Sequence, residues 1–193
     1  MRRALKLAVL LTAAGLLPAP AAAQAGSGVR LIVNLAGGPG SARFQCATCL
    51  TQKEQGSVGN IRIGRPIRSD LVVGLDVNGW AKKQDAVTIS VGAADLFAQY
   101  FPGFPRFGFY VLGGFGGGTI REDQQVVEQG QKFTVTADGS GLGYHAGAGY
   151  LFQIAPHVAA NAWATYFGTS RVELLGDPFN ARIFALGLGL TLN

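Results

Sequence analysis

The sequence predicts an all-β fold, an eight-stranded antiparallel up-and-down transmembrane β-barrel, and three observations support this prediction. Charged residues make up only 14% of the 193 residues, against roughly 25% in a typical soluble domain. Glycine is abundant, at 29 residues. After the first 25 residues, apolar side chains alternate with small or polar ones, and no run approaches the about 20 apolar residues that a membrane-spanning helix needs. A chain that crosses a membrane with strands fits all three observations.

The N-terminal segment has the pattern of an export signal. A basic start is followed by an apolar segment, Leu7–Leu17, that is too short to span a bilayer, and then by small residues that suit a signal peptidase. We expect cleavage after Ala25, with Ala23 as the alternative. The sequence therefore predicts a signal peptide over residues 1–25 and a barrel domain over residues 26–193.

Removal of the signal peptide would bring the chain close to electrical neutrality. The segment carries three of the 16 Lys and Arg residues and none of the 11 Asp and Glu residues. Binding to nucleic acid needs a clustered basic face. The sequence predicts no such face, and we expect no nucleic-acid partner.

Eight segments show the two-residue alternation of strands that have one apolar face. In the last of them, large apolar residues alternate with small ones: Phe184, Leu186, Leu188, Leu190 and Leu192 against Ala185, Gly187, Gly189 and Thr191. In the third, Leu75 and Val77 alternate with Asp76 and Asn78. The predicted strands are residues 29–38, 57–65, 70–81, 87–101, 106–119, 140–153, 158–170 and 180–192.

The connections between these strands alternate in length. Tight turns follow the second, fourth and sixth strands, at residues 65–69, 102–105 and 155–157. Long loops are predicted after the first, fifth and seventh strands, at residues 39–56, 120–139 and 171–179, whereas the link at 82–86 is short. Short turns at one end and long loops at the other are typical of bacterial outer-membrane barrels, whose turns are periplasmic and whose loops are extracellular.

Over residues 29–193 the chain resembles the eight-stranded outer-membrane β-barrel proteins of the OmpA and OmpX type. The resemblance rests on the signal peptide, the strand count, the loop alternation and the glycine-bearing last strand at 185–193. It implies a monomer in the outer membrane of a Gram-negative-type bacterium, with membrane lipid, lipopolysaccharide and the outer-membrane assembly machinery as partners. Many such barrels end in an aromatic residue that this machinery reads, whereas this sequence ends in Leu192 and Asn193.

Alternation alone does not tell which face of the sheet points outward. A soluble barrel of the lipocalin or streptavidin kind keeps its large apolar side chains inside. The strands of this chain offer too few charges to cover such a barrel, so we expect the apolar face to contact lipid. We also expect interfacial girdles from aromatic residues near the strand ends, namely Trp80, Tyr100, Phe101, Phe104, Phe107, Phe115, Phe133, Tyr150 and Phe152.

The polar face would then line a narrow lumen. Its predicted polar cluster consists of Arg30, Arg62, Asp76, Asn78, Asp95, Gln99 and His145, on the same face as Asn34 and Asn60. Because an unpaired buried charge costs several kcal/mol, we expect the two arginines to pair with the two aspartates. The cluster is either a structural plug that sets the strand register or the lining of a gated pore for small ions or water.

Cys46 and Cys49 lie in the first predicted loop. Export leads through an oxidising compartment, which favours a disulfide between them. A zinc site would need four ligands, and neither His is near in sequence. A metal shared between two molecules and an exchange-active pair are the alternatives.

We expect no catalytic residues, no metal site and no cofactor. Barrels that modify membrane lipid use a His together with a Ser and a carboxylate, and neither His145 nor His157 has such neighbours in the sequence. The glycines at 113–118 lack the Lys and the helix of a phosphate-binding loop. The sequence thus predicts a structural or interaction protein that acts through its loops, above all the polar segment 120–139; the alternatives are a narrow pore and a lipid-modifying enzyme. The alternative for this segment is a solvated hairpin extension, in which residues 133–136 continue the strand pairing above the membrane.

Overall fold

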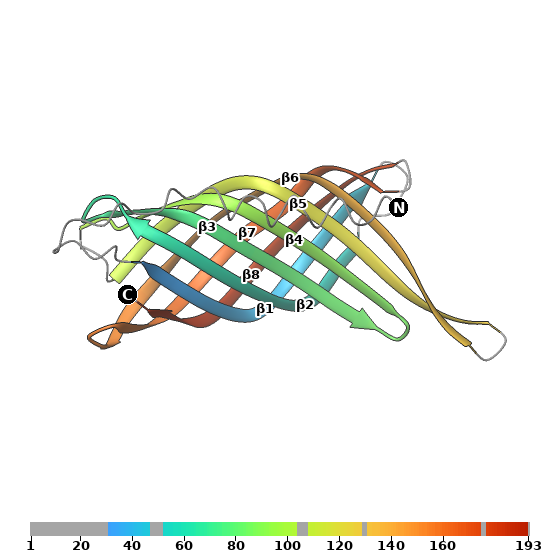
Figure 1. Ribbon diagram of the computed structural model, residues 1–193, viewed down its shortest axis with the longest axis horizontal. Coiled ribbons are helices and arrows are strands. Elements are labelled where there is room, and N and C mark those ends of the chain that lie inside the picture. The colour runs from blue at the N-terminus through green and yellow to red at the C-terminus, as the bar shows by residue number, and fades with distance from the viewer. Residues whose placement is uncertain (1–30, 47–51, 104–107, 129–130, 175–176, 193) are drawn as a thin grey trace, which may run out of the picture.

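A computed structural model describes residues 31–46, 52–103, 108–128, 131–174 and 177–192. These residues form one closed barrel in which each strand pairs antiparallel with the next and β1 pairs with β8, as predicted (Figure 1). No helix among them is long and apolar enough to cross a membrane. The strands are β1 (Ile32–Cys46), β2 (Gln52–Pro66), β3 (Leu71–Gln84), β4 (Val87–Tyr100), β5 (Gly108–Glu128), β6 (Gln131–Ala155), β7 (Val158–Leu174) and β8 (Asp177–Leu192).

The strands are longer than predicted at one end of the barrel, and the predicted long loops are wrong. Most of the segment 39–56 is paired strand of β1 and β2, and most of the segment 120–139 is paired strand of β5 and β6. The segment 171–179 likewise lies mostly in β7 and β8. These extensions are held by hydrogen bonds between backbone groups, which every sequence offers. Their sequences therefore do not need the apolar alternation on which the prediction was based.

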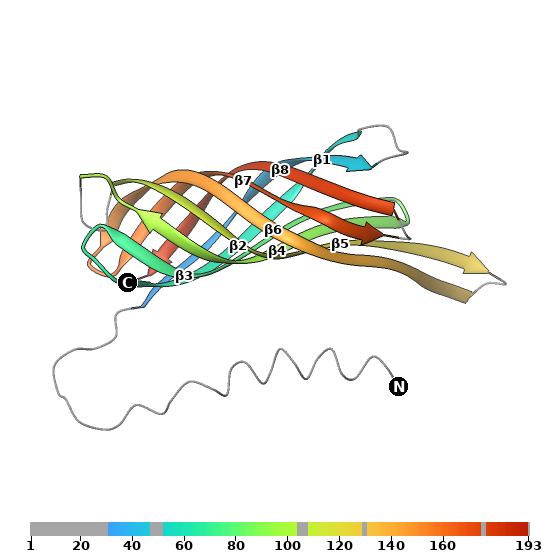
Figure 2. The same ribbon diagram turned by 90° about the horizontal axis from the view of Figure 1, so that it is seen from above.

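The lengthened strands make one end of the barrel different from the other. The β5–β6 hairpin projects beyond the neighbouring strands, and it does so at the end opposite the C-terminal end of β8 (Figures 1 and 2). The β3–β4 turn lies at the same end as this hairpin and consists of Asp85 and Ala86. Asp85 has a φ of 52°, and Asp is among the residues that tolerate this left-handed conformation.

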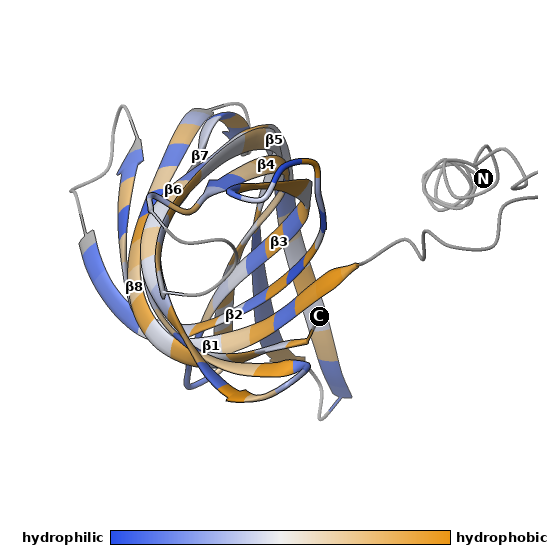
Figure 3. Cartoon of the chain, turned by 90° about the vertical axis from the view of Figure 1, so that its left-hand side faces the viewer, coloured by the Kyte–Doolittle hydropathy of each residue, from blue (hydrophilic) through white to orange (hydrophobic). Residues whose placement is uncertain are grey.

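Large apolar side chains cover the outside of the barrel. On β8, Leu188 is 74% exposed and Leu186 and Leu190 are each 51% exposed, whereas Ala185 and Thr191, which point to the other face, are buried. Apolar and polar residues alternate in this way along the strands (Figure 3). The outward apolar face is therefore as predicted, and it is the reverse of a soluble barrel's arrangement.

The lumen is filled by two apolar layers with a polar layer between them. Along β3 the inward residues run from Val72 through Asp76 and Asn78 to Trp80. Val72 belongs to an apolar cluster with Phe101 and Tyr110, and Trp80 belongs to another with Phe167 and Ile183.

Two of the predicted girdle residues therefore point the wrong way, because Trp80 and Phe101 are each only 1% exposed. Trp80 shares the inward parity of Asn78 on β3, and Phe101, which directly follows β4, shares that of Gln99. A position near a strand end does not change the face on which a side chain lies.

Candidate functional site

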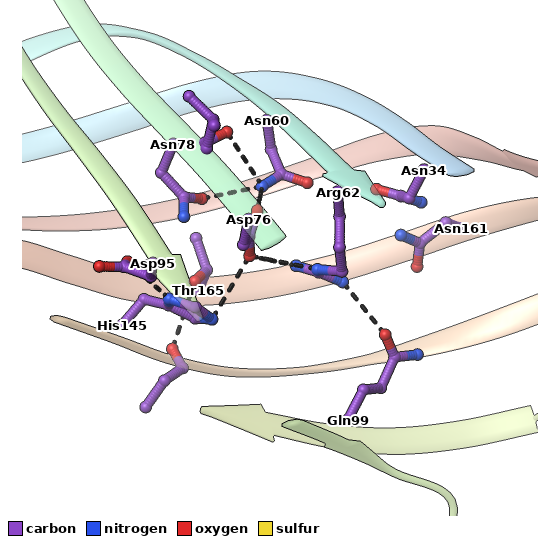
Figure 4. A network of polar contacts seen from close by, with 12 residues as sticks. Asn34, Asn60, Arg62, Asp76, Asn78, Asp95, Gln99, His145, Asn161 and Thr165 are labelled. Carbon is purple, nitrogen blue, oxygen red and sulfur yellow. Dashed lines mark hydrogen bonds and ion pairs between the residues drawn. The ribbon is translucent and has the colours of Figure 1, made fainter. Parts of the chain in front are cut away.

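The polar layer is built from residues that face one another across neighbouring strands. Register pairs Arg62 on β2 with Asp76 on β3, and Asp76 in turn with Asp95 on β4. His145 reaches the same layer from β6 (Figure 4). All four residues are less than 10% exposed, and Asp76 is fully buried. Three strands thus place two carboxylates and a guanidinium side by side in the lumen.

Asp76 and Arg62 form an ion pair at the centre of this layer. Arg62 donates from Nε and Nη2 to Asp76 Oδ2, at 3.1 and 3.0 Å. The other carboxylate oxygen of Asp76 accepts from Asn60 Nδ2, which also donates to Asn78 Oδ1 at 3.0 Å. The carboxylate is therefore held on both oxygens.

The remaining contacts of Arg62 come from β4. Its Nη1 donates to Gln99 Oε1 at 3.4 Å. Its Cζ lies 5.2 Å from the centroid of the Phe97 ring, within the range of a cation–π contact. The guanidinium is thus enclosed by a carboxylate, an amide and an aromatic ring.

His145 lies between the two carboxylates. Its Nδ1 is 2.8 Å from Asp95 Oδ2, a hydrogen-bond distance, and its Nε2 is 3.3 Å from Asp76 Oδ2, an ion-pair contact without hydrogen-bond geometry. The imidazole ring therefore contacts both carboxylates, while Arg62 contacts Asp76 from β2.

Glycine makes room for this arrangement. A Cβ at Gly114 would lie 2.4 Å from His145 Cε1 and equally close to the carbonyl oxygen of Leu96. A Cβ at Gly143 would lie 3.0 Å from Asp95 Oδ1. The glycine run at 113–118, which the sequence leaves without a role, therefore lets the His145 ring approach the sheet.

The structure gives the predicted cluster one expected pairing and one that was not expected. Arg62 contacts Asp76 as predicted, and among the described residues Asp95 contacts His145. The sequence places these side chains on one face, yet it does not tell which of them meet across the lumen. Arg30 lies outside the described residues.

Sequence reasoning missed further polar pairs in the lumen. Tyr110 donates to Asn161 Oδ1 at 2.9 Å, and Asn34 donates to Thr191 Oγ1 at 2.8 Å. Asn161 and Thr191 share the inward parity of their strands, which is the signal that could have identified them.

The network offers little space for a ligand. A cavity of about 20 Å³, lined by Asn34, Arg62 and Gln99 among others, has room for about one or two water molecules. The side chains that contact the nitrogens of His145 are Asp76 and Asp95, and neither is a Ser or Cys nucleophile. Within the described ranges, no group of His, Cys, Asp and Glu side chains is arranged to hold a metal ion. The arrangement is suited to holding strands together.

Two other sequence predictions concern the cysteine pair and His157. Cys49 and the side chain of Cys46 lie outside what the structure describes, so the disulfide stays a prediction. His157 is exposed in the turn between β6 and β7.

Three solved structures illustrate which known proteins share this fold. Ail, the attachment invasion locus protein of Yersinia pestis, matches at 13% identity over 83% of this chain and 98% of its own, with a TM-score of 0.57. Its complex with the heparin analogue sucrose octasulfate matches at 12% identity over 84% and 99%, with a TM-score of 0.54. Neisserial surface protein A matches at 19% identity over 86% and 99%, with a TM-score of 0.52. At such low identity these likenesses show the fold alone.

The sequence comparisons extend this result to the family. No curated protein sequence matches the chain. Residues 7–191, however, match the family model for the outer membrane protein beta-barrel domain, which covers nearly the whole sequence. The chain belongs to this family of outer-membrane β-barrels.

Proposed function

We propose that this protein is a non-enzymatic outer-membrane barrel that serves as a rigid base for surface contacts made by the β5–β6 hairpin. The observation that carries the proposal is the projection of this hairpin beyond the other strands (Figure 2). The family match supports the membrane location.

Beyond Gln125, whose N–H donates to the carbonyl oxygen of Ala86, the described part of the hairpin pairs only with itself. The pairing of β4 with β5 ends at Gln124, and the pairing of β6 with β7 begins at Leu142. Beyond these points, β5 and β6 continue as a two-stranded ribbon up to the pair of Glu128 and Gln131. Both edges of the ribbon present backbone groups that a partner strand could use.

A cluster of side chains braces the base of this ribbon. Thr136 on β6 donates to Asp123 Oδ1 at 2.6 Å, and Arg121 Nε donates to both oxygens of the same carboxylate at 2.9 and 3.0 Å. The Thr136 hydrogen bond, and then the Arg121 guanidinium, lower the pKa of Asp123. The carboxylate therefore stays ionised at neutral pH and keeps the brace in place.

Apolar side chains stand exposed on the ribbon. Val127 is 64% exposed, Val135 is 58% exposed, and Val126 and Phe133 are also in contact with solvent. Because these residues lie where the hairpin projects beyond the neighbouring strands, we expect lipid not to cover them. Exposed apolar groups beside free strand edges are suited to contact with another macromolecule.

The filled lumen argues against the alternative of a narrow pore. Apolar layers lie on both sides of the ion pairs, with Trp80 in one and Phe101 in the other. We expect the protein to be silent in planar-bilayer recordings, and regular single-channel openings would overturn the closed-barrel part of the proposal. The buried position of His145, between two carboxylates, likewise favours a structural role over that of a catalytic base.

The proposal is tested by shortening the hairpin. Gln125–Thr134 would be replaced by Asn-Gly, which forms two-residue turns well, so that the pair of Gln124 and Val135 closes the hairpin. Cells that display the intact protein should aggregate or adhere to a protein-coated surface more than cells that display the shortened form. Equal display and a heat-sensitive shift in gel mobility would confirm that the barrel folds. Equal adhesion by both forms would contradict the proposal.

A further inference from the structure

Three cationic side chains stand side by side on the outside of the barrel, on strands other than β5 and β6 of the hairpin. Register pairs Arg43 on β1 with Lys53 on β2 and, on the other side, with Arg182 on β8. All three are exposed and have outward parity. They line a surface pocket of about 300 Å³ together with Ser41, Tyr166 and Phe184.

Nothing in the described part of the chain balances these charges. The carboxylates that form ion pairs are bound elsewhere; Glu54, which neighbours Lys53, pairs with Lys82. Like charges directly opposite one another across a sheet are destabilising. An anion from outside the protein would relieve the repulsion among Arg43, Lys53 and Arg182.

The position along the barrel indicates where this anion lies. On β8 every outward residue from Leu192 to Phe184 is apolar and exposed. At about 3.3 Å per residue this run measures roughly 26 Å along the strand, or about 20 Å in height once the strand tilt of about 40° is included. That is close to the roughly 25 Å apolar band of outer-membrane barrels, and Arg182 follows as the next outward residue.

Aromatic hydroxyls mark the same level. Tyr166 pairs with Phe184 in register, and the Tyr144 hydroxyl lies beside Tyr166 and Arg182. Gly168 lies opposite Arg182 and leaves room for the Tyr144 hydroxyl, because a Cβ at Gly168 would lie 3.0 Å from Tyr144 Oη. Tyrosine at such a height is typical of a membrane interface.

The end of the barrel identifies the leaflet. The cations lie toward the hairpin end, and the turns that join β2 to β3 and β6 to β7 lie toward the other end (Figure 1). The turn end is the periplasmic one in bacterial barrels, so the cations are at the headgroup level of the outer leaflet. Phosphorylated glycolipid forms that leaflet.

We propose that Arg43, Lys53 and Arg182 form a binding site for a phosphate group of an outer-leaflet glycolipid. Guanidinium groups bind phosphate oxygens through paired, charge-assisted hydrogen bonds, and Lys adds a point charge. The apolar face of β8 below Arg182 receives the acyl chains of the same lipid. The site rests on the outer-membrane location and does not depend on the hairpin.

The test compares matched variants of the full-length barrel in zwitterionic nanodiscs that contain diphosphoryl lipid A. The target variant is Arg43→Gln, Lys53→Gln and Arg182→Gln. The control is Arg65→Gln, Arg68→Gln and Lys132→Gln, which removes the same charges from exposed positions elsewhere. Native mass spectrometry of the extracted protein measures the retained lipid. Wild type and control should retain it alike, whereas the target variant should lose about tenfold or more in affinity.

Further arms identify the source of the phosphate. The wild-type protein should retain dephosphorylated lipid A as weakly as the target variant retains diphosphoryl lipid A. Inorganic phosphate alone should bind to the wild-type protein only weakly. Equal retention of phosphorylated and dephosphorylated lipid, or equal loss in target and control variants, would overturn the proposal. So would binding of inorganic phosphate as tight as that of the lipid. The comparison of lipids on wild type needs no variant, so a failure of the target variant to fold leaves the test decisive. The shortened hairpin should bind lipid normally, which separates this proposal from the preceding one.

Discussion

Asp95 and His145 meet in the lumen with 2.8 Å between Oδ2 and Nδ1, although they come from strands β4 and β6, which are not neighbours in the sheet. The two side chains can reach each other across the intervening strand β5, because β5 carries Gly114 and Gly116, which have no side chain, at this level. The contact therefore ties three strands together inside the barrel. The first three predictions below test how much the barrel depends on this network.

Removal of Asp76 should destabilise the barrel strongly. The change Asp76→Ala leaves Arg62 buried without its carboxylate and His145 with one partner instead of two. Breaking a buried pair in this way costs about 3 to 5 kcal/mol. Urea unfolding of the protein in detergent measures the loss. The control Asp138→Ala removes an exposed carboxylate and should change stability by less than about 0.5 kcal/mol; similar effects of the two changes would contradict the buried network.

His145 and Asp95 should show coupled effects on stability. His145→Ala removes the ring that contacts both Asp95 and Asp76, so it should destabilise more than Asp95→Ala, which removes only one of these two contacts. The double variant should lose less stability than the two single variants lose together. The difference, the coupling energy, should be about 0.5 to 3 kcal/mol. A double-mutant cycle in urea measures this coupling. Strict additivity would show that the 2.8 Å contact has no energetic role.

Gly114 and Gly117 provide a matched pair on β5. Gly114→Ala places a Cβ against His145 and the backbone of Leu96, whereas a Cβ at Gly117 meets no heavy atom within 4 Å. Overpacking typically costs about 1 to 3 kcal/mol, and Gly to Ala within a strand otherwise stabilises slightly. Thermal unfolding should therefore separate the two variants in opposite directions. Equal melting temperatures would mean that the His145 ring is not held as described.

The Cys46 and Cys49 prediction concerns the end of β1. Mass spectrometry of the untreated protein should find a disulfide between them, because export leads through an oxidising compartment. Replacing both by Ser should leave barrel stability nearly unchanged, since closing so short a loop removes little chain entropy. Two free thiols, or stoichiometric zinc, would disprove the disulfide.

The N-terminal segment offers a direct test of export. Sequencing of the mature N-terminus should begin at Gly26, because the predicted cleavage follows Ala25. A mature chain that begins at Gln24 would favour the alternative site after Ala23. An intact Met1 in the membrane fraction would contradict the prediction of a cleaved signal peptide.

The sequence by itself determined the faces of the strands. Successive side chains point to opposite sides of a strand whatever its neighbours are, so Leu75 and Val77 had to oppose Asp76 and Asn78. The same rule puts Trp80 inside the barrel, although its place near the end of the predicted strand suggested a position at the membrane interface. Strand number and the outward apolar face followed from this local rule together with the scarcity of charge.

Only the tertiary structure decided which side chains meet. Register is a relation between two strands, and closure of the barrel brings β1 and β8 together, so the sequence could not indicate that Arg43 and Arg182 would stand opposite each other. The partner of Asp95 depended in the same way on the small residues of β5, which let His145 reach across. The sequence suggested strand pairing at residues 133–136, and β6 does pair with β5 there. The full length of the β5–β6 hairpin did not follow from the sequence, because a ribbon in water needs backbone pairing but no apolar face.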